Sequence, residues 1–190
     1  MKLKAKLRYL IFKTFPKRYL KKFILFFEHK LNYNLLVLLE KGLKVDVVFD
    51  VGAYRGEWSK LLSKTSLKKR KFFLFDANEE NRNFLEKLNF KFFFHILSDQ
   101  NKDVNFYSNF STGDSYLKEQ TSLYKENSNV ILRKATTLDD VVKKENLPSP
   151  DFLKIDTQGS EIDILKGSKI SVSKCSLIYL ECPIIEYNLK

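Results

Sequence analysis

A chain of 190 residues with 44% hydrophobic content can bury one substantial core, and this composition argues against a disordered protein. Its longest purely apolar runs span only about five residues, whereas a membrane-spanning helix needs about 20, so an integral membrane protein is also disfavoured. The formal net charge of +11 is concentrated at one end, because residues 1–44 hold 12 Lys and Arg against two Glu. The other residues hold 22 basic and 21 acidic groups.

The N-terminal segment has the pattern of basic amphipathic helices. Apolar residues recur at helical spacing from Leu3 to Phe15, with Lys and Arg between them. Pro16 should end this first helix. A second apolar-rich helix is expected from about residue 17 to residue 41, with Gly42 as its stop.

We therefore divide the chain into a basic helical segment, residues 1–44, and a domain, residues 45–190. Two interpretations of the segment stay open. Its helices could lie on an anionic membrane surface, which would place the protein in the cytoplasm at the inner face of the membrane. Alternatively, their apolar faces pack on the domain and the lysines are solvated. The two cysteines, Cys175 and Cys182, have neither a disulfide pattern nor a zinc-ligand spacing, which fits a reducing, cytoplasmic setting.

After Gly42 the sequence changes to short apolar runs that lead into acidic residues. These runs are continuous rather than alternating, as is typical of strands buried on both faces of a sheet. Helical stretches at about 57–65, 79–89 and 160–168 lie between several of them, which predicts a doubly wound, mostly parallel, Rossmann-like α/β sheet. The expected strands are 45–49, 71–75, 90–97, 151–155 and 177–180.

The stretch from 104 to 137 breaks this alternation. Its apolar pieces at 104–107 and 130–132 predict a β-hairpin insertion before the fourth strand of the sheet.

An acidic residue at the end of every expected strand points to a ligand site. Ligands of open α/β sheets bind at the carboxyl ends of the strands, and Asp and Glu are poor strand formers. The alternative is that these acids cap the helices that follow. The residues concerned are Asp50, Asp76, Asp99, Asp156 and Glu181.

The loop from Asp50 to Gly56, with the sequence Asp-Val-Gly-Ala-Tyr-Arg-Gly, joins the first strand to a helix. Gly52 allows a tight turn, and Gly56 lets the helix start close to a ligand. Asp50 places a carboxylate beneath the loop, where a cationic ligand is favoured. Asp76 ends the next strand, 20 residues after Gly56, where an acid would accept both ribose hydroxyls of a nucleoside cofactor.

The same loop distinguishes between two classes of cofactor. Nicotinamide and flavin dinucleotides use Gly-x-Gly-x-x-Gly, but Tyr54 and Glu57 stand at the second and third glycine positions. The Tyr54 side chain would obstruct a pyrophosphate and Glu57 would repel it. S-adenosylmethionine has no pyrophosphate and carries a positive sulfonium and ammonium, so the loop favours it, with Asp99 accepting a hydrogen bond from the adenine amino group. The expected cofactor-binding residues are Asp50, Gly52, Ala53, Tyr54, Gly56, Asp76, Ala77, Ser98 and Asp99.

Five ordered motifs connect the chain to a known family, at 48–56, 75–78, 97–99, 137–140 and 153–161. Over roughly residues 46 to 188 the chain resembles the FkbM-type methyltransferases. The run Asp-Thr-Gln-Gly-Ser-Glu that starts at Asp156 is similar to the family's Asp-x-Glu-Gly-x-Glu, with Gln158 in place of the middle acid, and Asp76-Ala77 stands where the family more often has Glu-Pro.

The resemblance implies methyl transfer from S-adenosylmethionine, typically to a hydroxyl oxygen. The family's link with surface glycans implies a saccharide or related small-molecule acceptor and a role in polysaccharide biosynthesis. Family members continue beyond the region of Glu186 into a helix and a closing β-hairpin, whereas this sequence stops at Lys190. We therefore expect a domain truncated at its C-terminus, with the fifth strand as an exposed edge through which the chain could self-associate.

The catalytic candidates are carboxylates. Asp156, at the tip of the fourth strand, is the first candidate for the base that removes the acceptor's proton, and Glu161 and Glu181 are expected to face the same cleft. Such clustered carboxylates could instead hold a divalent cation through oxygen ligands. Lys154 is interpreted as a surface charge and His95 as a packed ring within a strand.

Three other functions remain open. A truncated, non-catalytic protein that binds S-adenosylmethionine or acts as a scaffold fits the same motifs. A nucleic-acid methyltransferase fits the positive charge but is disfavoured, because enzymes acting on base amines usually show Asp/Asn-Pro-Pro-Tyr/Phe where this chain has Asp-Thr-Gln-Gly at 156–159. A dinucleotide oxidoreductase is disfavoured by Tyr54.

Overall fold

The computed structural model describes residues 30–108, 114–117 and 129–182. The expected helix at 3–15 and the beginning of the next one lie outside these residues. The chain divides into two units, residues 1–43 and residues 44–190, which are taken one at a time. In the first unit, helix α3 (Lys30–Glu40) falls within the helix expected from about 17 to 41.

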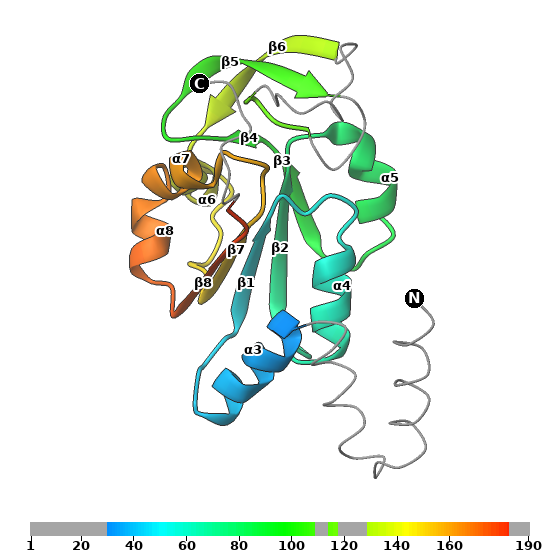
Figure 1. Cartoon of the computed structure of the whole chain (residues 1–190), viewed down its shortest axis with the longest axis vertical. Coiled ribbons are helices and arrows are strands. Elements are labelled where there is room, and N and C mark those ends of the chain that lie inside the picture. Colours follow the sequence, from blue (N-terminus) through cyan, green and yellow to red (C-terminus); the bar gives the residue numbers. More distant parts are fainter. Residues whose placement is uncertain (1–29, 109–113, 118–128, 183–190) are drawn as a thin grey trace, which may run out of the picture. The chain divides into compact units, whose positions relative to one another are not determined.

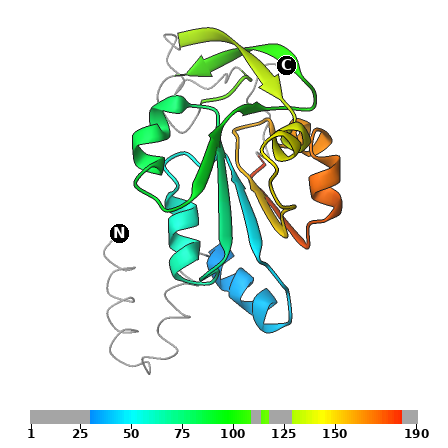
Figure 2. The same ribbon diagram turned by 180° about the vertical axis from the view of Figure 1, so that it is seen from behind.

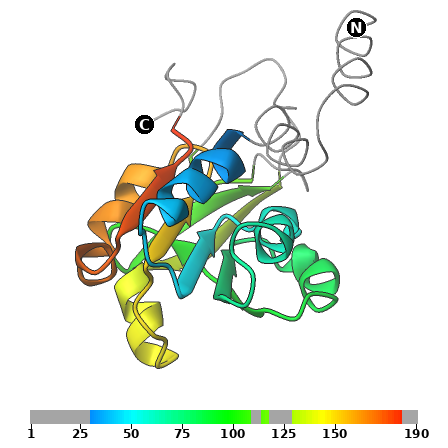
Figure 3. The ribbon, with the colours of Figure 1, turned by 90° about the horizontal axis from the view of Figure 1, so that it is seen from below.

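The second unit contains a five-stranded parallel sheet with the strand order β3-β2-β1-β7-β8. Helices α4 and α5 lie on one side of this sheet, and helices α6, α7 and α8 lie on the other (Figures 1 and 3). This arrangement confirms the predicted doubly wound α/β fold. The strands are β1 (Val47–Val51), β2 (Lys71–Asp76), β3 (Lys91–Phe94), β7 (Phe152–Ile155) and β8 (Leu177–Leu180). The helices are α4 (Glu57–Lys64), the short 3-10 turn η1 (Glu79–Asn81), α5 (Arg82–Leu85), α6 (Leu138–Lys144), α7 (Glu161–Lys166) and α8 (Lys169–Ser173).

The central strands are buried on both faces, which explains why their sequences are apolar without alternation. Every residue of β1 and β7 is buried. Phe49 contacts Phe73 and Phe75 with ring centroids 5.5 and 5.1 Å apart, so aromatic packing joins β1 to β2. Strand β8, at one edge of the described sheet, is less covered and leaves Ile178 38% exposed.

A second sheet is built from the predicted insertion, with the order β4-β6-β5. Strands β5 (Lys102–Ser108) and β6 (Asn129–Thr136) pair antiparallel, and the short strand β4 (Ile96–Leu97) pairs parallel with β6. The hairpin β5–β6 lies beyond the carboxyl ends of the central strands, at the top of Figure 1, and Figure 2 shows it from behind. The expected β-hairpin is therefore confirmed.

The third expected strand, 90–97, is wrong in one respect. It is divided at His95, whose N–H still donates to the carbonyl oxygen of Asp76 at 2.9 Å, while the following residues join the second sheet. His95 thus lies between two strands, and burial lowers the pKa of its half-buried imidazole. An apolar run cannot show by itself that its two halves pair with different partners.

Two short helices were missed by the sequence interpretation. Helix α6 begins after Thr137, whose hydroxyl accepts a hydrogen bond from the N–H of Asp140 at 3.0 Å, a capping arrangement that the spacing of these residues could have indicated. Asp139 in turn accepts hydrogen bonds from the backbone of Ile170 and Ser171 at 2.8 and 2.9 Å, which connects α6 to the start of α8.

Among the residues that the structure describes, no helix has the length and apolar character needed to span a bilayer.

Candidate functional site

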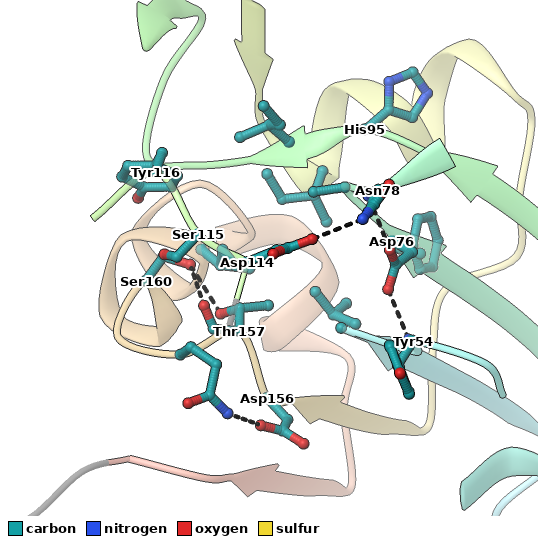
Figure 4. A pocket seen from close by; sticks show the side chains of 18 of the residues that line it. Tyr54, Asp76, Asn78, His95, Asp114, Ser115, Tyr116, Asp156, Thr157 and Ser160 are labelled. Carbon is teal, nitrogen blue, oxygen red and sulfur yellow. Dashed lines mark hydrogen bonds between the residues drawn. The ribbon is translucent and has the colours of Figure 1, made fainter. Parts of the chain in front are cut away.

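A pocket lies at the carboxyl ends of β1, β2 and β7, where the sequence predicted a ligand site (Figure 4). Its wall also includes residues of β4, β5 and the segment 114–116 of the insertion. Among the predicted cofactor and catalytic residues, the pocket is lined by Gly52, Tyr54, Asp76, Ala77 and Asp156. The predicted residues that fall outside this lining are Asp50, Ala53, Gly56, Ser98, Asp99, Glu161 and Glu181.

The loop after β1 is shaped by a close approach of two chain segments. Gly52 has φ of +74°, and a Cβ atom at this position would overlap the carbonyl oxygen of Asp156. The N–H groups of Gly52 and Ala53 both donate to the carbonyl oxygen of Phe75, at 2.9 and 3.0 Å. The loop is thus connected to the end of β2 and packed against the end of β7, which leaves room only for glycine at position 52.

The second glycine of the loop serves packing. A Cβ atom on Gly56 would overlap the side chain of Leu88 and crowd those of Leu74 and Leu85. Gly56 therefore lets α4 begin against apolar side chains of β2, of α5 and of the turn after α5, and it does not line the pocket.

Asp76 is the carboxylate most firmly fixed in the pocket wall. Only 8% of the residue is exposed, and its Oδ2 accepts a hydrogen bond from the N–H of Tyr54 at 2.6 Å. Its Oδ1 accepts from the N–H of Asn78 at 2.9 Å and from the side-chain amide of Asn81 at 3.1 Å. Burial raises the pKa of Asp76, although these hydrogen bonds oppose the effect. A carboxylate has about four lone-pair sites, so capacity remains on this group for a ligand hydroxyl.

Lys154 lies beneath the pocket, and its interpretation as a surface charge is wrong. The residue is 4% exposed, and its Nζ lies 3.0 Å from Oδ1 of Asp50 and 3.4 Å from Oδ2 of Asp156. It also donates to the carbonyl oxygen of Gly52 at 3.0 Å. These neighbouring carboxylates raise the pKa of Lys154 and outweigh its burial, which acts in the opposite direction. A lysine in the middle of an apolar strand was the sequence signal that could have indicated its ion pairs with buried carboxylates.

Asp50 belongs to the same buried cluster. It is fully buried, and its Oδ2 accepts a hydrogen bond from the hydroxyl of Ser59 at 2.6 Å. Its carboxylate is therefore directed at Lys154 and at helix α4 instead of the pocket.

Glu161 organises the loop that follows β7. It is 1% exposed, and its carboxylate accepts hydrogen bonds from the N–H of Thr157 at 2.9 Å and of Gly159 at 3.0 Å. Gln158, between these two residues, has φ of +57°, so the chain turns around the carboxylate. This loop carries Asp156, Thr157 and Gln158 into the pocket wall. In the structure Glu161 thus holds the loop that positions these three residues in the pocket wall.

Replacing Glu161 by alanine is expected to lower the free energy of unfolding by about 2–4 kcal/mol, because the part-buried N–H groups of the loop would lose a buried, charged acceptor. Urea denaturation measures this change. Glu86→Ala, at an exposed carboxylate, is the matched control and should change stability by about 0.5 kcal/mol or less. Equal effects of the two substitutions would contradict the positioning role.

The three catalytic candidates are not brought together as a cluster. The side chain of Asp156 is 25% exposed at the pocket, that of Glu161 is engaged with its loop, and Glu181 is exposed at the end of β8. Within residues 30–108, 114–117 and 129–182, no group of three or more His, Cys, Asp or Glu side chains is arranged to hold a metal ion. Of the three, Asp156 alone lines the pocket.

Asp99 forms an ion pair outside the pocket lining. Its Oδ1 lies 2.7 Å from Nζ of Lys102 and accepts a hydrogen bond from the hydroxyl of Ser98 at 2.9 Å. The hydrogen bond from Lys102 lowers the pKa of Asp99. Ser98 itself is fully buried.

Residues 114–116 line the pocket, and the sequence did not predict this. Tyr116 donates its hydroxyl proton to Asp163 at 3.0 Å. The hydroxyl oxygen of Ser98 lies 3.2 Å from the phenolic oxygen of Tyr116. Asp114 accepts a hydrogen bond from the side-chain amide of Asn78 at 2.6 Å, across the pocket in Figure 4. These contacts join residues far apart in the chain, so no local sequence pattern predicts them.

The pocket therefore has two chemically different parts. One part is apolar, with side chains of Ala77, Ile96, Leu97 and Phe106 next to the carboxylate of Asp76. The other part lies at the tips of β1 and β7, where Asp156 is the exposed member of a buried charge cluster. Such an arrangement suits an elongated ligand with an aromatic, hydroxylated end and a positively charged end.

Comparison with known proteins gives the following similarities. A family model for the methyltransferase FkbM domain matches residues 50–188. The chain is also similar to the crystal structure of methyltransferase FkbM from Methylobacillus flagellatus KT, with 18% sequence identity and a TM-score of 0.47. This similarity covers 70% of the present chain and 32% of the other, so the chain spans about a third of that protein's length. No curated protein matches the chain.

Proposed function

Because the chain belongs to the FkbM methyltransferase family, we propose that it transfers a methyl group from S-adenosylmethionine to a hydroxyl oxygen of a saccharide or related small molecule. The observation that carries this proposal is the pocket at the strand ends, which combines an apolar part beside Asp76 with the carboxylate of Asp156.

The residues of the pocket fit S-adenosylmethionine in three respects. The apolar side chains of Ile96, Leu97 and Phe106 offer a surface for an adenine ring. Asp76 accepts three hydrogen bonds from the protein and retains about one lone-pair site for a ribose hydroxyl. The carboxylate of Asp156 favours a positive ligand charge at the opposite end.

S-adenosylmethionine supplies a methyl group that passes to the acceptor oxygen and leaves a neutral thioether behind. The acceptor hydroxyl must lose its proton in this reaction, and Asp156 is a partly exposed carboxylate in the wall, at the tip of β7, that can take it. Gln158, whose amide lies 3.4 Å from Oδ1 of Asp156, can help to hold that carboxylate in place. Lys154, on its other oxygen, restricts it further.

Calorimetric titration of the purified chain tests the cofactor. We expect S-adenosylmethionine and S-adenosylhomocysteine to bind and NAD to bind negligibly. Asp76→Ala should weaken binding by about 1–3 kcal/mol because a charged hydrogen-bond acceptor is lost, whereas Asp103→Ala, an exposed carboxylate outside the pocket, should leave it unchanged.

The same titration has a predictable pH dependence. Since the pKa of Asp76 is raised, this carboxylate takes up a proton earlier than an ordinary Asp as the pH falls, and affinity should then decline. Tight binding of NAD with none of S-adenosylmethionine would contradict the proposed function.

We further propose that the basic segment, residues 1–44, holds the protein on an anionic membrane surface near a membrane-borne acceptor. Its sequence supports this, with 12 Lys and Arg against two Glu, although residues 1–29 lie outside the described structure. Replacing Lys21 and Lys22 by Gln should weaken binding to phosphatidylserine vesicles roughly tenfold at low salt, and less at high salt. Co-sedimentation with vesicles measures the effect. The double change of Lys68 and Lys69 to Gln is the charge-matched control, and an equal loss there would contradict a membrane role for the segment.

A further inference from the structure

The buried ammonium of Lys154 changes the charge that the pocket presents. The register of β1 and β7 pairs Asp50 with Lys154 directly across the two strands, so their side chains are neighbours by construction. Asp50 is fully buried and the Lys154 side chain is 5% exposed, which keeps this ion pair away from the screening of bulk water. The pair also adjoins two residues of the pocket lining, Gly52 and Asp156, at 3.0 and 3.4 Å from Nζ.

With both carboxylates and the ammonium charged, the cluster has a net charge of −1. Without Lys154 the same two carboxylates would present −2 to the pocket. The surplus charge rests on Asp156, which is the member that lines the pocket. Lys154 therefore separates two tasks, because one carboxylate is neutralised within the fold and the other is left for the ligand.

This difference bears on methyl transfer because the reaction removes a positive charge. S-adenosylmethionine is a sulfonium, whereas S-adenosylhomocysteine is a neutral thioether. A stronger negative field at the sulfur would stabilise the charged ground state more than the transition state, in which that charge is dispersing, and would slow the reaction. A buried cation beside the carboxylates offsets this effect.

We infer that Lys154 sets the preference of the pocket for S-adenosylmethionine over S-adenosylhomocysteine, by cancelling the charge of Asp50 beside it. The inference rests on the proposed function, since it requires that both ligands bind. Lys154 does not line the pocket, so its role in specificity acts through its charge and not through a contact with the ligand.

The test compares variants that differ in the net charge of the cluster. Dissociation constants for the two ligands are measured by calorimetry, and their ratio is the readout. In Asp50→Asn the cluster is neutral, and the preference for S-adenosylmethionine should fall roughly tenfold, as expected for one unit charge several ångströms away in a partly buried site. In the double variant Asp50→Asn/Lys154→Met the net charge is −1 again, and the preference should return toward that of the unmodified chain.

A matched control retains the cation. Asp50→Asn/Lys154→Arg should show the same low preference as Asp50→Asn alone, because arginine is also positive. If the Met variant does not fold, Asp50→Asn/Lys154→Gln has the same charge and gives the same comparison. A purely structural role of Lys154 predicts no such recovery, since the double variant removes more native contacts than the single one.

The outcomes are distinguishable. Equal ligand ratios in Asp50→Asn and in the double variant, with both ligands still binding, would overturn the inference and leave the proposed function intact. Failure of the unmodified chain to bind either ligand would overturn the proposed function, and with it the inference.

Discussion

Gly52→Ala is expected to weaken binding of S-adenosylmethionine and S-adenosylhomocysteine by about 100-fold or more. The backbone at this position has φ of +74°, and the added Cβ atom would overlap the carbonyl oxygen of Asp156. The ends of β1 and β7 would have to separate, which would move the loop from its hydrogen bonds to Phe75 and displace Asp156 in the pocket wall. Calorimetry measures the affinity, and circular dichroism shows whether the sheet is retained.

Gly42→Ala is the matched control for this substitution. Gly42 also has positive φ, at +100°, but a Cβ atom there would meet no heavy atom within 4 Å. It therefore introduces comparable backbone strain without an overlap, and ligand affinity should stay within a few-fold of the original. If Gly52→Ala bound the ligands as well as Gly42→Ala does, the close approach at the strand ends would have no part in binding.

Asp156→Asn is expected to reduce turnover by about 10²–10⁴-fold while S-adenosylmethionine still binds within about tenfold. The substitution preserves the size of the side chain and removes its ability to take the acceptor's proton. Turnover is measured as S-adenosylhomocysteine formed in the presence of candidate saccharide, lipid-linked and nucleic-acid acceptors.

Glu181→Gln provides the comparison. This carboxylate is exposed at the end of β8 and lies outside the pocket lining, so its neutralisation should leave turnover nearly unchanged. A loss confined to Glu181→Gln would transfer the role of base to that residue. If the chain binds S-adenosylmethionine and turns over no acceptor of any class, the non-catalytic binding protein becomes the better description.

The main sheet could be predicted because its signal is local. Strands β1, β2, β7 and β8 come from short apolar runs that lead into an acidic residue, whereas β3 ends before His95, and the loop at 50–56 carries its glycines at fixed spacing. The small sheet was predicted less completely. The division of the third strand at His95 depends on which strand each half pairs with, and this is a property of the folded chain.

The roles of individual charged residues were harder to predict than the position of the site. That Lys154 forms an ion pair with Asp50 follows from the register of β1 and β7, which makes the two residues cross-strand partners. Glu161 is close in sequence to Asp156, yet it accepts hydrogen bonds from the intervening loop because that loop folds back around it. The contacts of Tyr116 join three segments that no local pattern relates.

The small sheet has an apolar cluster of its own, formed by Ile96, Val104, Phe106 and Ala135, separate from the cluster of the central strands. Two walls of one pocket thus pack mostly in different apolar clusters, although Leu97 of β4 packs in the central one. Substitutions along β5 can remodel the wall that includes Phe106 while the loop at Gly52 and the tips of β1 and β7 stay as they are. For protein engineering, a library confined to residues 102–108 would therefore vary the wall that includes Phe106 and leave the loop at Gly52 unchanged.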